Sequence, residues 1–429
     1  TAMPLGIDTP STIGIAYAVM GPAYIATRDA QLTWHIGMAT LFMIGVVKIF
    51  TSFFGGLLQR MIPTAGLLGP LAGIGLMLLG FLPLVEIFNE AVVGMVALGL
   101  IFTTLMSRMQ LPGRMPGVLA AVILGTGIHF ALGFGGYLPE FTAPALDMHF
   151  ALPLPTVEFL KTVPQSMHYL SIAIPFGILT IIGGINNTES ARLAGDDYRT
   201  RDILLTEAFS SLIAAFFGGV AQTTPYIGHP AYKKMGATWW YTLLTGILIG
   251  VCSVVGLLSL LVSLIPRAVI APIFIFIGFE IMRQAYKDSP PAHSPAVSLS
   301  VLPVIASMVL IILGQFMGAA GATPDKLPAR LQVMHQTLTM LSNGFIITGL
   351  LWGSMLAFLI DNKARLAALC AAVCAVFTLF GIIHSVLPTG ELYLPWHIHA
   401  QAHYLTSAGY FALCLILLAL KSSNDKALI

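Results

Sequence analysis

The sequence predicts an all-α polytopic membrane protein built from two inverted repeats, each of which contains one short broken span. Three observations support this prediction: the composition, the long apolar runs and an internal repeat. Of the 429 residues, 57% are hydrophobic and 9% are charged, whereas a soluble domain carries about 25% charged residues. So few charges could not cover a soluble fold of this size. A formal net charge of +2 gives no electrostatic reason to expect a nucleic acid partner.

The apolar runs are long enough to cross a bilayer. A hydrocarbon core of about 30 Å needs about 20 apolar residues per helix. On that basis the sequence predicts about fourteen crossings, counting a shorter, interrupted piece at 222–236. The other runs lie near residues 12–26, 34–59, 63–88, 90–107, 115–134, 166–186, 202–219, 238–264, 267–284, 297–317, 338–360, 366–386 and 403–420.

The distribution of basic residues gives the orientation. If the first run crosses from inside to outside, most Lys and Arg side chains, including Arg192 and Lys233, fall on the inner side, as is typical of cytoplasmic loops. The connection over 135–165 then faces outward as an extracytoplasmic loop. We therefore predict an integral, multi-pass protein of a plasma membrane of the bacterial inner type. The first residues lack a basic segment, so no secretory signal peptide is expected.

Several classes of site are not indicated by the sequence. The four cysteines lie inside apolar runs without zinc-ligand spacing, so neither a disulfide nor a metal is predicted from them. No phosphate-binding loop of the G-x-x-x-x-G-K-[ST] type occurs, which argues against an ATP-driven pump. We recognise no catalytic constellation and expect neither an enzyme nor a cofactor. His397, His399 and His403 cluster in the last outer loop; they indicate either a divalent metal or simply a solvated interfacial loop.

An internal repeat is the most informative feature of the sequence. Three dipeptides near the start recur in the same order and at one constant offset. The matched pairs are Thr9-Pro10 with Thr224-Pro225, Ala16-Tyr17 with Ala231-Tyr232, and Met20-Gly21 with Met235-Gly236. A second match follows each copy and pairs Ile62-Pro63, Ala65 and Ile74-Gly75 with Ile265-Pro266, Ala268 and Ile277-Gly278. The conserved order indicates that the chain is a duplication.

The repeat also predicts a discontinuous centre. An odd number of crossings separates the two copies, so the second is inverted in the membrane, which is typical of secondary transporters. Pro10 and Pro225 cannot donate a backbone hydrogen bond, and non-helical backbone at membrane depth must be buried in protein or line a cavity. We therefore predict that the two Thr-Pro segments face each other near the midplane, each leading into a half-helix whose N–H groups face a solute. The simpler alternative is two proline-kinked spans.

A stretch of the second copy resembles a known family. Its residues are Gly183-Gly184-Ile185-Asn186-Asn187, Ala194-Gly195-Asp196, Gly218-Gly219, Thr223-Thr224-Pro225-Tyr226-Ile227-Gly228 and Ala271-Pro272. This pattern is similar to that of the nucleobase-ascorbate transporter (xanthine/uracil permease) family, including its adenine/guanine-hypoxanthine permease relatives, over residues 5–360. The resemblance implies an inverted-repeat transporter fold with core and gate domains, usually as a homodimer, in which the third and tenth spans pair short strands around the substrate.

The resemblance also implies domain boundaries. The expected core parts are 1–61 and 166–264, the gate parts are 62–134 and 265–360, and two additional C-terminal helices occupy 361–429. In this register the chain begins at the family's third span. Either the C-terminal pair takes the vacant place beside 9–24, or the sequence lacks two helices. The two carboxylates that bind substrate in the family's nucleobase carriers fall on Ile182 and Gly228, which puts a nucleobase substrate in doubt.

The candidate site lies between the Thr-Pro segments and one face of the helix over 182–189. The expected substrate-binding set is Asp8, Thr9, Ser11, Ile182, Asn186, Glu189, Thr223, Thr224, Tyr226, Ile227, Gly228 and His229. Glu189 is the candidate for coupling to H⁺ or Na⁺, because a carboxylate within a span is costly and usually functional. Alternatively, Glu189 pairs with Arg192 at the surface, Asp8 only caps its half-helix, and His229 is structural.

Two other charged residues lie in apolar runs. Lys48 either extends to the membrane surface or meets an Asp or Glu of a neighbour, and Glu207 is interpreted as interacting with the dipole of its own helix.

These observations together predict secondary-active transport of a small polar or anionic solute across the lipid bilayer by alternating access, with a nucleobase as the first subclass to test. An inorganic or organic anion carrier of the same architecture is the nearest alternative. A non-transporting membrane subunit that retained the fold is an alternative from another class.

Overall fold

The computed structural model describes residues 1–53, 61–138, 141–144, 148, 150–226, 229–388, 390, 392–398 and 400–420. The described part is mainly helical and contains one two-stranded sheet, so the predicted all-α class is confirmed. The chain divides into two compact units: unit 1 comprises Thr1–Gly73, Leu154–Thr238 and Gln284–Ile429, and unit 2 comprises Ile74–Pro153 and Trp239–Arg283. These boundaries differ from those of the expected core and gate parts, whose assignment stays a prediction.

The first broken span lies in unit 1. It begins with strand β1 (Leu5–Ile7) and continues as helix α1 (Thr9–Ile15), a π-helical turn over Ala16–Met20, and helix α2 (Gly21–Thr27). Asp8 separates strand from helix in an extended conformation, and its side chain accepts a hydrogen bond from the backbone N–H of Ser11. Pro10 follows in the first turn of α1, where a residue without an N–H costs no helical hydrogen bond.

The second broken span pairs with the first. Strand β2 (Thr223–Pro225) runs antiparallel to β1, with Gly6 opposite Thr224 and Ile7 opposite Thr223. Two backbone hydrogen bonds extend the pairing, from Asp8 N–H to the Gln222 carbonyl and from Tyr226 N–H to the Pro4 carbonyl, both at 2.9 Å. Helix α12 (His229–Lys234) follows. The two broken spans therefore meet, although the pairing involves residues 5–7 and 223–225 and Thr9-Pro10 lies just beyond it.

The two Thr-Pro pairs do not hold equivalent structural places. Thr9 and Pro10 begin α1, whereas Thr224 and Pro225 belong to β2. Proline is tolerated both in the first turn of a helix and on a sheet edge, so the same dipeptide suits either place. Each Thr-Pro segment leads into a short helix as expected, α1 directly and α12 a few residues later.

Three long helices of unit 1 support the strand pair. They are α3 (Ala30–Ser52), α10 (Leu170–Leu193) and α11 (Thr200–Phe216). Glycines allow close approach: a Cβ built at Gly177 would lie 2.8 Å from Val47, and one built at Gly45 would lie 2.8 Å from Leu212. The short helix α9 (Val163–Ser166) precedes α10, and a buried cluster that includes Met38, Leu41 and Phe159 fills the space beside α3.

Gly14 is expected to be needed for the packing of α1 on α10. A Cβ at Gly14 would overlap the buried ring of Phe176, and overpacking costs about 1–3 kcal/mol. Alanine gains about 1 kcal/mol over glycine inside a helix, which offsets only part of this cost. Gly14→Ala should therefore lower the thermal unfolding midpoint in detergent. Gly183→Ala is the matched control, because a Cβ at Gly183 meets nothing within 4 Å, and its midpoint should be unchanged or higher. Equal midpoints for both variants would contradict this packing.

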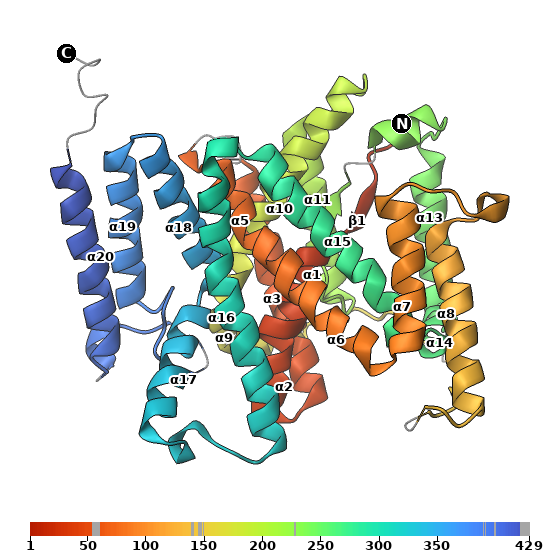
Figure 1. Ribbon diagram of the computed structural model, residues 1–429. Coiled ribbons are helices and arrows are strands. Elements are labelled where there is room, and N and C mark those ends of the chain that lie inside the picture. Colours follow the sequence, from red (N-terminus) through yellow and green to blue (C-terminus); the bar gives the residue numbers. More distant parts are fainter. Residues whose placement is uncertain are drawn as a thin grey trace. The chain divides into compact units, whose positions relative to one another are not determined.

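The remaining long helices of unit 1 follow the second broken span, apart from α5. They are α5 (Thr64–Ile74), α16 (Ser294–Ala319), α17 (Ala329–Ser342), α18 (Phe345–Ile360), α19 (Ala364–Leu379) and α20 (Ala402–Ala419). Figure 1 shows α18, α19 and α20 side by side. Buried residues of α19 and α20, including Ala367 and Cys414, pack with Met355 and Phe358 of α18. Whether this pair takes the vacant place beside 9–24 stays a prediction.

Unit 2 contains Ile74-Gly75 and the whole second copy of the second repeat match. Its helices are α6 (Leu82–Asn89), α7 (Ala91–Ile101), α8 (Gly117–Phe134), α13 (Trp240–Val254), α14 (Leu257–Leu264) and most of α15 (Arg267–Asp288). Gly75 and Gly278, which match in the sequence repeat, meet directly: a Cβ at Gly278 would overlap the Gly75 carbonyl. Ile87 packs nearby on Ala271 and Ile275. Matched segments of the two copies thus contact each other within unit 2.

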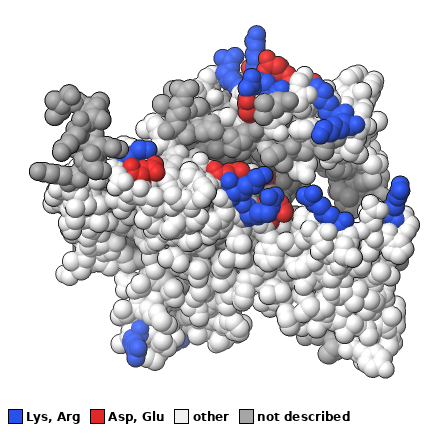
Figure 2. Space-filling view, turned by 45° about the horizontal axis from the view of Figure 1, so that its top comes forward, with Lys and Arg blue, Asp and Glu red and all other residues white. Residues whose placement is uncertain are grey.

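Fewer helices qualify as spans than the sequence predicts. Within the described residues, six helices are long and apolar enough to cross a membrane, or up to eight if each bent pair counts as one span. The predicted count of about fourteen rested on apolar runs, and several runs form short or broken helices instead, such as α1 with α2. Figure 2 shows charged side chains gathered in small groups amid wide uncharged surface, as expected for a protein that contacts lipid.

Candidate functional site

Two oppositely charged side chains lie buried beside the strand pair. Lys48 of α3 and Glu207 of α11 are both 0% exposed, and the Lys48 ammonium is paired with Glu207 Oε1. The same ammonium donates hydrogen bonds to Gln222 Oε1 and to the Thr223 carbonyl, each at 3.2 Å. Of the two interpretations of Lys48, pairing with a neighbour's carboxylate is confirmed. Glu207 meets this lysine rather than only its own helix dipole.

Asp8 joins this cluster from the other strand. Its Oδ2 accepts from Ser11 N–H at 3.0 Å, and Gln222 Nε2 donates to the same oxygen at 3.4 Å. The capping interpretation of Asp8 is therefore confirmed. One consequence corrects the sequence-based expectation: the Ser11 N–H at the start of α1 already binds a carboxylate and is not free for a solute. The residues that join β1, β2, α3 and α11 here are Asp8, Lys48, Glu207, Gln222 and Thr223, which we call the charged cluster.

Two polar atoms of the charged cluster have no hydrogen-bond partner within the described part of the chain. They are Glu207 Oε2 and Thr223 Oγ1, and both are buried. Buried polar atoms are normally satisfied, because leaving one unpaired costs the desolvation of that group. Gly184 of α10 borders the same place, since a Cβ built there would lie 3.4 Å from Glu207 Oε2. The arrangement can therefore accept a hydrogen-bond donor or a cation.

Helix α10 contacts the strands through Asn187. Its side-chain amide donates to the Pro225 carbonyl, a carbonyl at the end of β2. Asn187 belongs to the motif that carries the family resemblance, although it is not in the expected substrate-binding set.

The charge at the start of α12 is arranged around Asp196. His229 Nε2 donates to Asp196 Oδ2 at 2.8 Å, and Lys233 Nζ lies 3.0 Å from Asp196 Oδ1. Partial burial raises the pKa of Asp196, but the hydrogen bonds from Lys233 and His229 outweigh it and lower that pKa to about 2. His229 is buried, and this contact is the structural role that the sequence left as its alternative.

The structure brings together only part of the expected substrate-binding set. Asp8, Thr9 and Ser11 surround the junction of β1 and α1, and Thr223 and Thr224 lie in β2. Tyr226 follows β2 and is 50% exposed. Ile182 and Asn186 lie in α10, whereas Ile227 and Gly228 lie outside the described residues.

Glu189 does not join the charged cluster. Its side chain is 50% exposed and pairs with Arg192 one turn later, at 2.5 Å. This is the surface pairing that the sequence left as the alternative to a coupling role. The hydrogen bond from Arg192 lowers the pKa of Glu189, which favours the ionised carboxylate at the surface.

Sequence reasoning left Lys48, Asn187, Glu207 and Gln222 out of the expected site, although it allowed for a carboxylate partner of Lys48. Lys48 and Glu207 carried a usable signal, because charged residues inside apolar runs are costly and mark functional sites. Their partnership was not visible, since they lie 159 positions apart. Gln222 and Asn187 have no signal of this kind.

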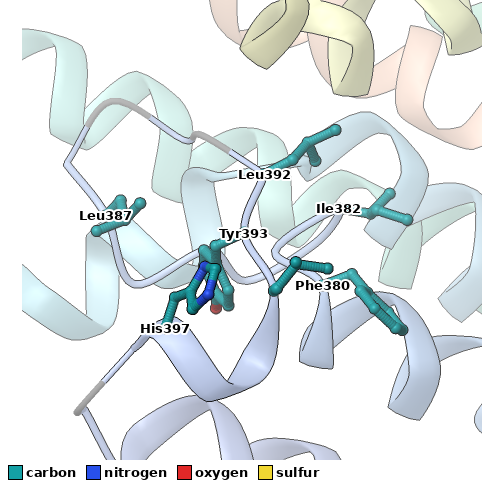
Figure 3. Close-up of a pocket in the computed structure, with 7 residues that line it drawn as sticks. Phe380, Ile382, Leu387, Leu392, Tyr393 and His397 are labelled. Atoms are coloured by element: carbon teal, nitrogen blue, oxygen red, sulfur yellow. The ribbon is translucent and has the colours of Figure 1, made fainter.

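The predicted histidine cluster lies elsewhere in unit 1. A surface pocket of about 590 Å³ is lined by Phe380, Ile382, Leu387, Leu392, Tyr393, Leu394 and His397 (Figure 3). His403 is buried at the start of α20, and His399 lies outside the described residues. Among the described residues no group of three His, Cys, Asp or Glu could hold a metal ion. The apolar lining offers little polar chemistry, so the charged cluster is the stronger candidate site.

Comparison with known proteins supports the fold. No protein-family model matches the chain, and no curated protein matches it. Among solved structures, the chain is similar to the transmembrane domain of BicA, a bicarbonate transporter from a cyanobacterium, with a TM-score of 0.55 and 19% sequence identity. The match covers 74% of this chain and 84% of that domain. The predicted inverted-repeat transporter fold is thereby confirmed, and with the apolar helices it indicates an integral multi-pass membrane protein.

Proposed function

We propose that this protein is a secondary-active transporter that carries a small polar or anionic solute across the membrane by alternating access. One observation carries the proposal: two short strands from the two halves of the chain pair at a buried charged cluster. Buried charges and unwound backbone within a membrane fold are typical of transport sites. The likeness to a bicarbonate transporter's transmembrane domain supports the same class of function.

The proposed solute site is the junction of β1, β2 and α1. Asp8, Ser11, Thr223 and Thr224 supply its polar groups, and Tyr226 lies at its exposed side. We assign coupling to Glu207 rather than to Glu189, because Glu207 is fully buried with one unpaired oxygen and Glu189 is half exposed and paired with Arg192. The co-transported ion is H⁺ or Na⁺. We also propose that the protein is a homodimer in the plasma membrane. The sequence resemblance to the nucleobase-ascorbate transporter family supports this part of the proposal.

An anion is the favoured solute. The name of the similar structure is that of a bicarbonate transporter, and Ile182 stands where the family's nucleobase carriers place a carboxylate for the base. A nucleobase is the second candidate, since the motif over 183–187 resembles that family and Asn187 contacts β2. For this solute, amide and hydroxyl groups would replace the missing carboxylate as hydrogen-bond partners.

Uptake by the purified protein in proteoliposomes tests the proposal. The panel contains bicarbonate, sulfate, a dicarboxylate, uracil and xanthine, each radiolabelled, with protein-free liposomes as the control. We expect saturable uptake of at least one anion, with competition by the same unlabelled anion. Uptake of uracil or xanthine alone would select the nucleobase subclass. Silence on every solute would favour the alternative of a non-transporting subunit that retained the fold.

A further inference from the structure

The Lys48 ammonium is surrounded by oxygen atoms of the kind that bind metal cations. Its partners are a carboxylate oxygen of Glu207, the amide oxygen of Gln222 and the backbone carbonyl of Thr223. Transporters commonly bind sodium with this mixture, in which carbonyls of unwound backbone supply part of the coordination. The Thr223 carbonyl belongs to β2, so the ammonium lies at the broken span itself.

The charges around Lys48 also match a site for a monovalent cation. Glu207 and Asp8 are the acidic members of the charged cluster, and Gln222 joins them by contacting both Lys48 and Asp8. Glu207 is the carboxylate that contacts the ammonium, whereas Asp8 is held by the Ser11 N–H and the Gln222 amide. An unpaired charge within a membrane protein is expensive, so the ionised Glu207 requires a cation at this place, and the Lys48 ammonium supplies it.

Two further buried oxygens belong to the residues that contact Lys48. Glu207 Oε2 and Thr223 Oγ1 are buried and without a partner within the described part of the chain. The backbone of α10 lies beside Glu207, because a Cβ built at Gly184 would be 3.4 Å from Glu207 Oε2. A side-chain cation therefore already lies among the oxygens of this place.

We propose that Lys48 is a tethered cation that occupies the position of a sodium ion between β2 and α11, so that this carrier has no bound Na⁺ at the charged cluster. The meaning of this inference for ion coupling depends on the proposed function, whereas the occupancy of the site does not. Removing the ammonium while keeping the oxygens should convert the cluster into a sodium site. Transport, if it is coupled to an ion here, should then be independent of Na⁺ in the wild-type protein.

Thermal unfolding of purified protein in detergent tests the occupancy directly. The wild type, Lys48→Ala and Lys48→Ser are compared in NaCl, KCl and choline chloride at equal ionic strength. A ligand that binds only the folded state raises the unfolding midpoint as its concentration passes its Kd. We expect a saturable rise of about 2 °C or more in Na⁺ for the two shortened variants, and equal midpoints in the three salts for the wild type.

Matched controls separate a bound ion from a general salt effect. Lys48→Met removes the charge but keeps the aliphatic volume, so no space opens and no sodium response is expected. Lys161→Ala removes an exposed lysine and should leave the salt response of the wild type unchanged. Lys48→Ala combined with Glu207→Gln retains the space but lacks the carboxylate, and it should lose the sodium response of Lys48→Ala.

Two results would overturn the inference. One is a saturable, sodium-specific stabilisation of the wild type, which remains measurable even if both shortened variants fail to fold. The other is a folded Lys48→Ala or Lys48→Ser protein with equal midpoints in Na⁺ and K⁺. Neither readout uses transport, so the two tests are independent. An absence of uptake for every solute would refute the proposed function and would not decide whether Lys48 replaces a sodium ion.

Discussion

Replacing Glu207 with glutamine is expected to reduce solute uptake strongly and to destabilise the fold. The variant keeps the size of the side chain but removes the charge that faces the buried Lys48 ammonium. Removing one partner of a buried ion pair costs about 3–5 kcal/mol, because the remaining charge stays desolvated and unpaired. We expect the thermal midpoint in detergent to fall. The rate of uptake in proteoliposomes should fall by about tenfold or more, which corresponds to an increase of at least about 1.4 kcal/mol in the activation free energy of transport.

A double substitution separates the two effects. Lys48→Met with Glu207→Leu replaces both charges by apolar groups of similar volume, which is often neutral or stabilising for buried pairs. We therefore expect the double variant to recover most of the stability that Lys48→Met or Glu207→Gln loses alone. Uptake should stay low, because the apolar pair holds no charge beside β2.

The outcomes distinguish a structural pair from a functional one. Recovery of both stability and uptake in the double variant would mean that the pair only fills space. Loss of uptake in Glu207→Gln without any change in stability would contradict the burial of the pair. As a control, Glu189→Gln removes an exposed carboxylate that pairs with Arg192, and a surface pair of this kind contributes only about 0–1 kcal/mol. That variant should stay close to the wild type in both measurements.

Cysteines placed opposite each other in β1 and β2 are expected to cross-link and to block transport reversibly. Gly6 faces Thr224 across the strand pair. Opposed residues of antiparallel strands have Cα atoms about 4.5–5.5 Å apart, within the range of about 4.4–6.8 Å found in disulfides. A Cβ at Gly6 meets nothing within 4 Å, so Gly6→Cys with Thr224→Cys should fold. The cross-link fixes the two halves of the chain together at the proposed site.

The cross-link is read by cutting the chain between the two cysteines. The native free cysteines are first replaced by alanine, and a protease site is inserted beside Pro153, between the exposed Leu152 and Leu154. After oxidation and cleavage the fragments should stay joined on a denaturing gel, and dithiothreitol should separate them. In uncleaved, oxidised protein, dithiothreitol should restore uptake. Each single-cysteine variant serves as a control. Separate fragments after oxidation would argue against the strand pairing, and unchanged uptake in the joined protein would exclude this place from the transport cycle.

The sequence predicted the class of the protein and its central feature. Hydropathy and charge bias are sums over many residues, so they can be calculated without knowledge of any contact. The repeat also needs no contact to be seen, and it identified both Thr9-Pro10 and Thr224-Pro225 as parts of a meeting point. The structure pairs β1, which precedes Thr9-Pro10, with β2, which contains Thr224-Pro225. It also brings together Gly75 and Gly278 of the second match.

The sequence was less successful with the register and with individual site residues. The repeat equated Pro10 with Pro225, yet one lies in a helix and the other in a strand, because proline suits both places. Glu189 was the expected coupling residue because it is a carboxylate on the candidate face of the helix over 182–189. In the structure Glu189 pairs with Arg192 at the surface. Two oppositely charged residues one turn apart can pair within a span as well as at the surface, so their spacing did not decide between the two.

By itself, the sequence determined that the chain lies in a membrane, that it is a duplication, and that two proline-containing segments break its spans, because these properties depend on composition and order along the chain. Only the tertiary structure decided which charges meet. Lys48 and Glu207 are 159 positions apart, and their pairing depends on how α3 and α11 pack against β2. The physical reason is that a buried charge must find a partner, and packing alone determines which partner is within reach.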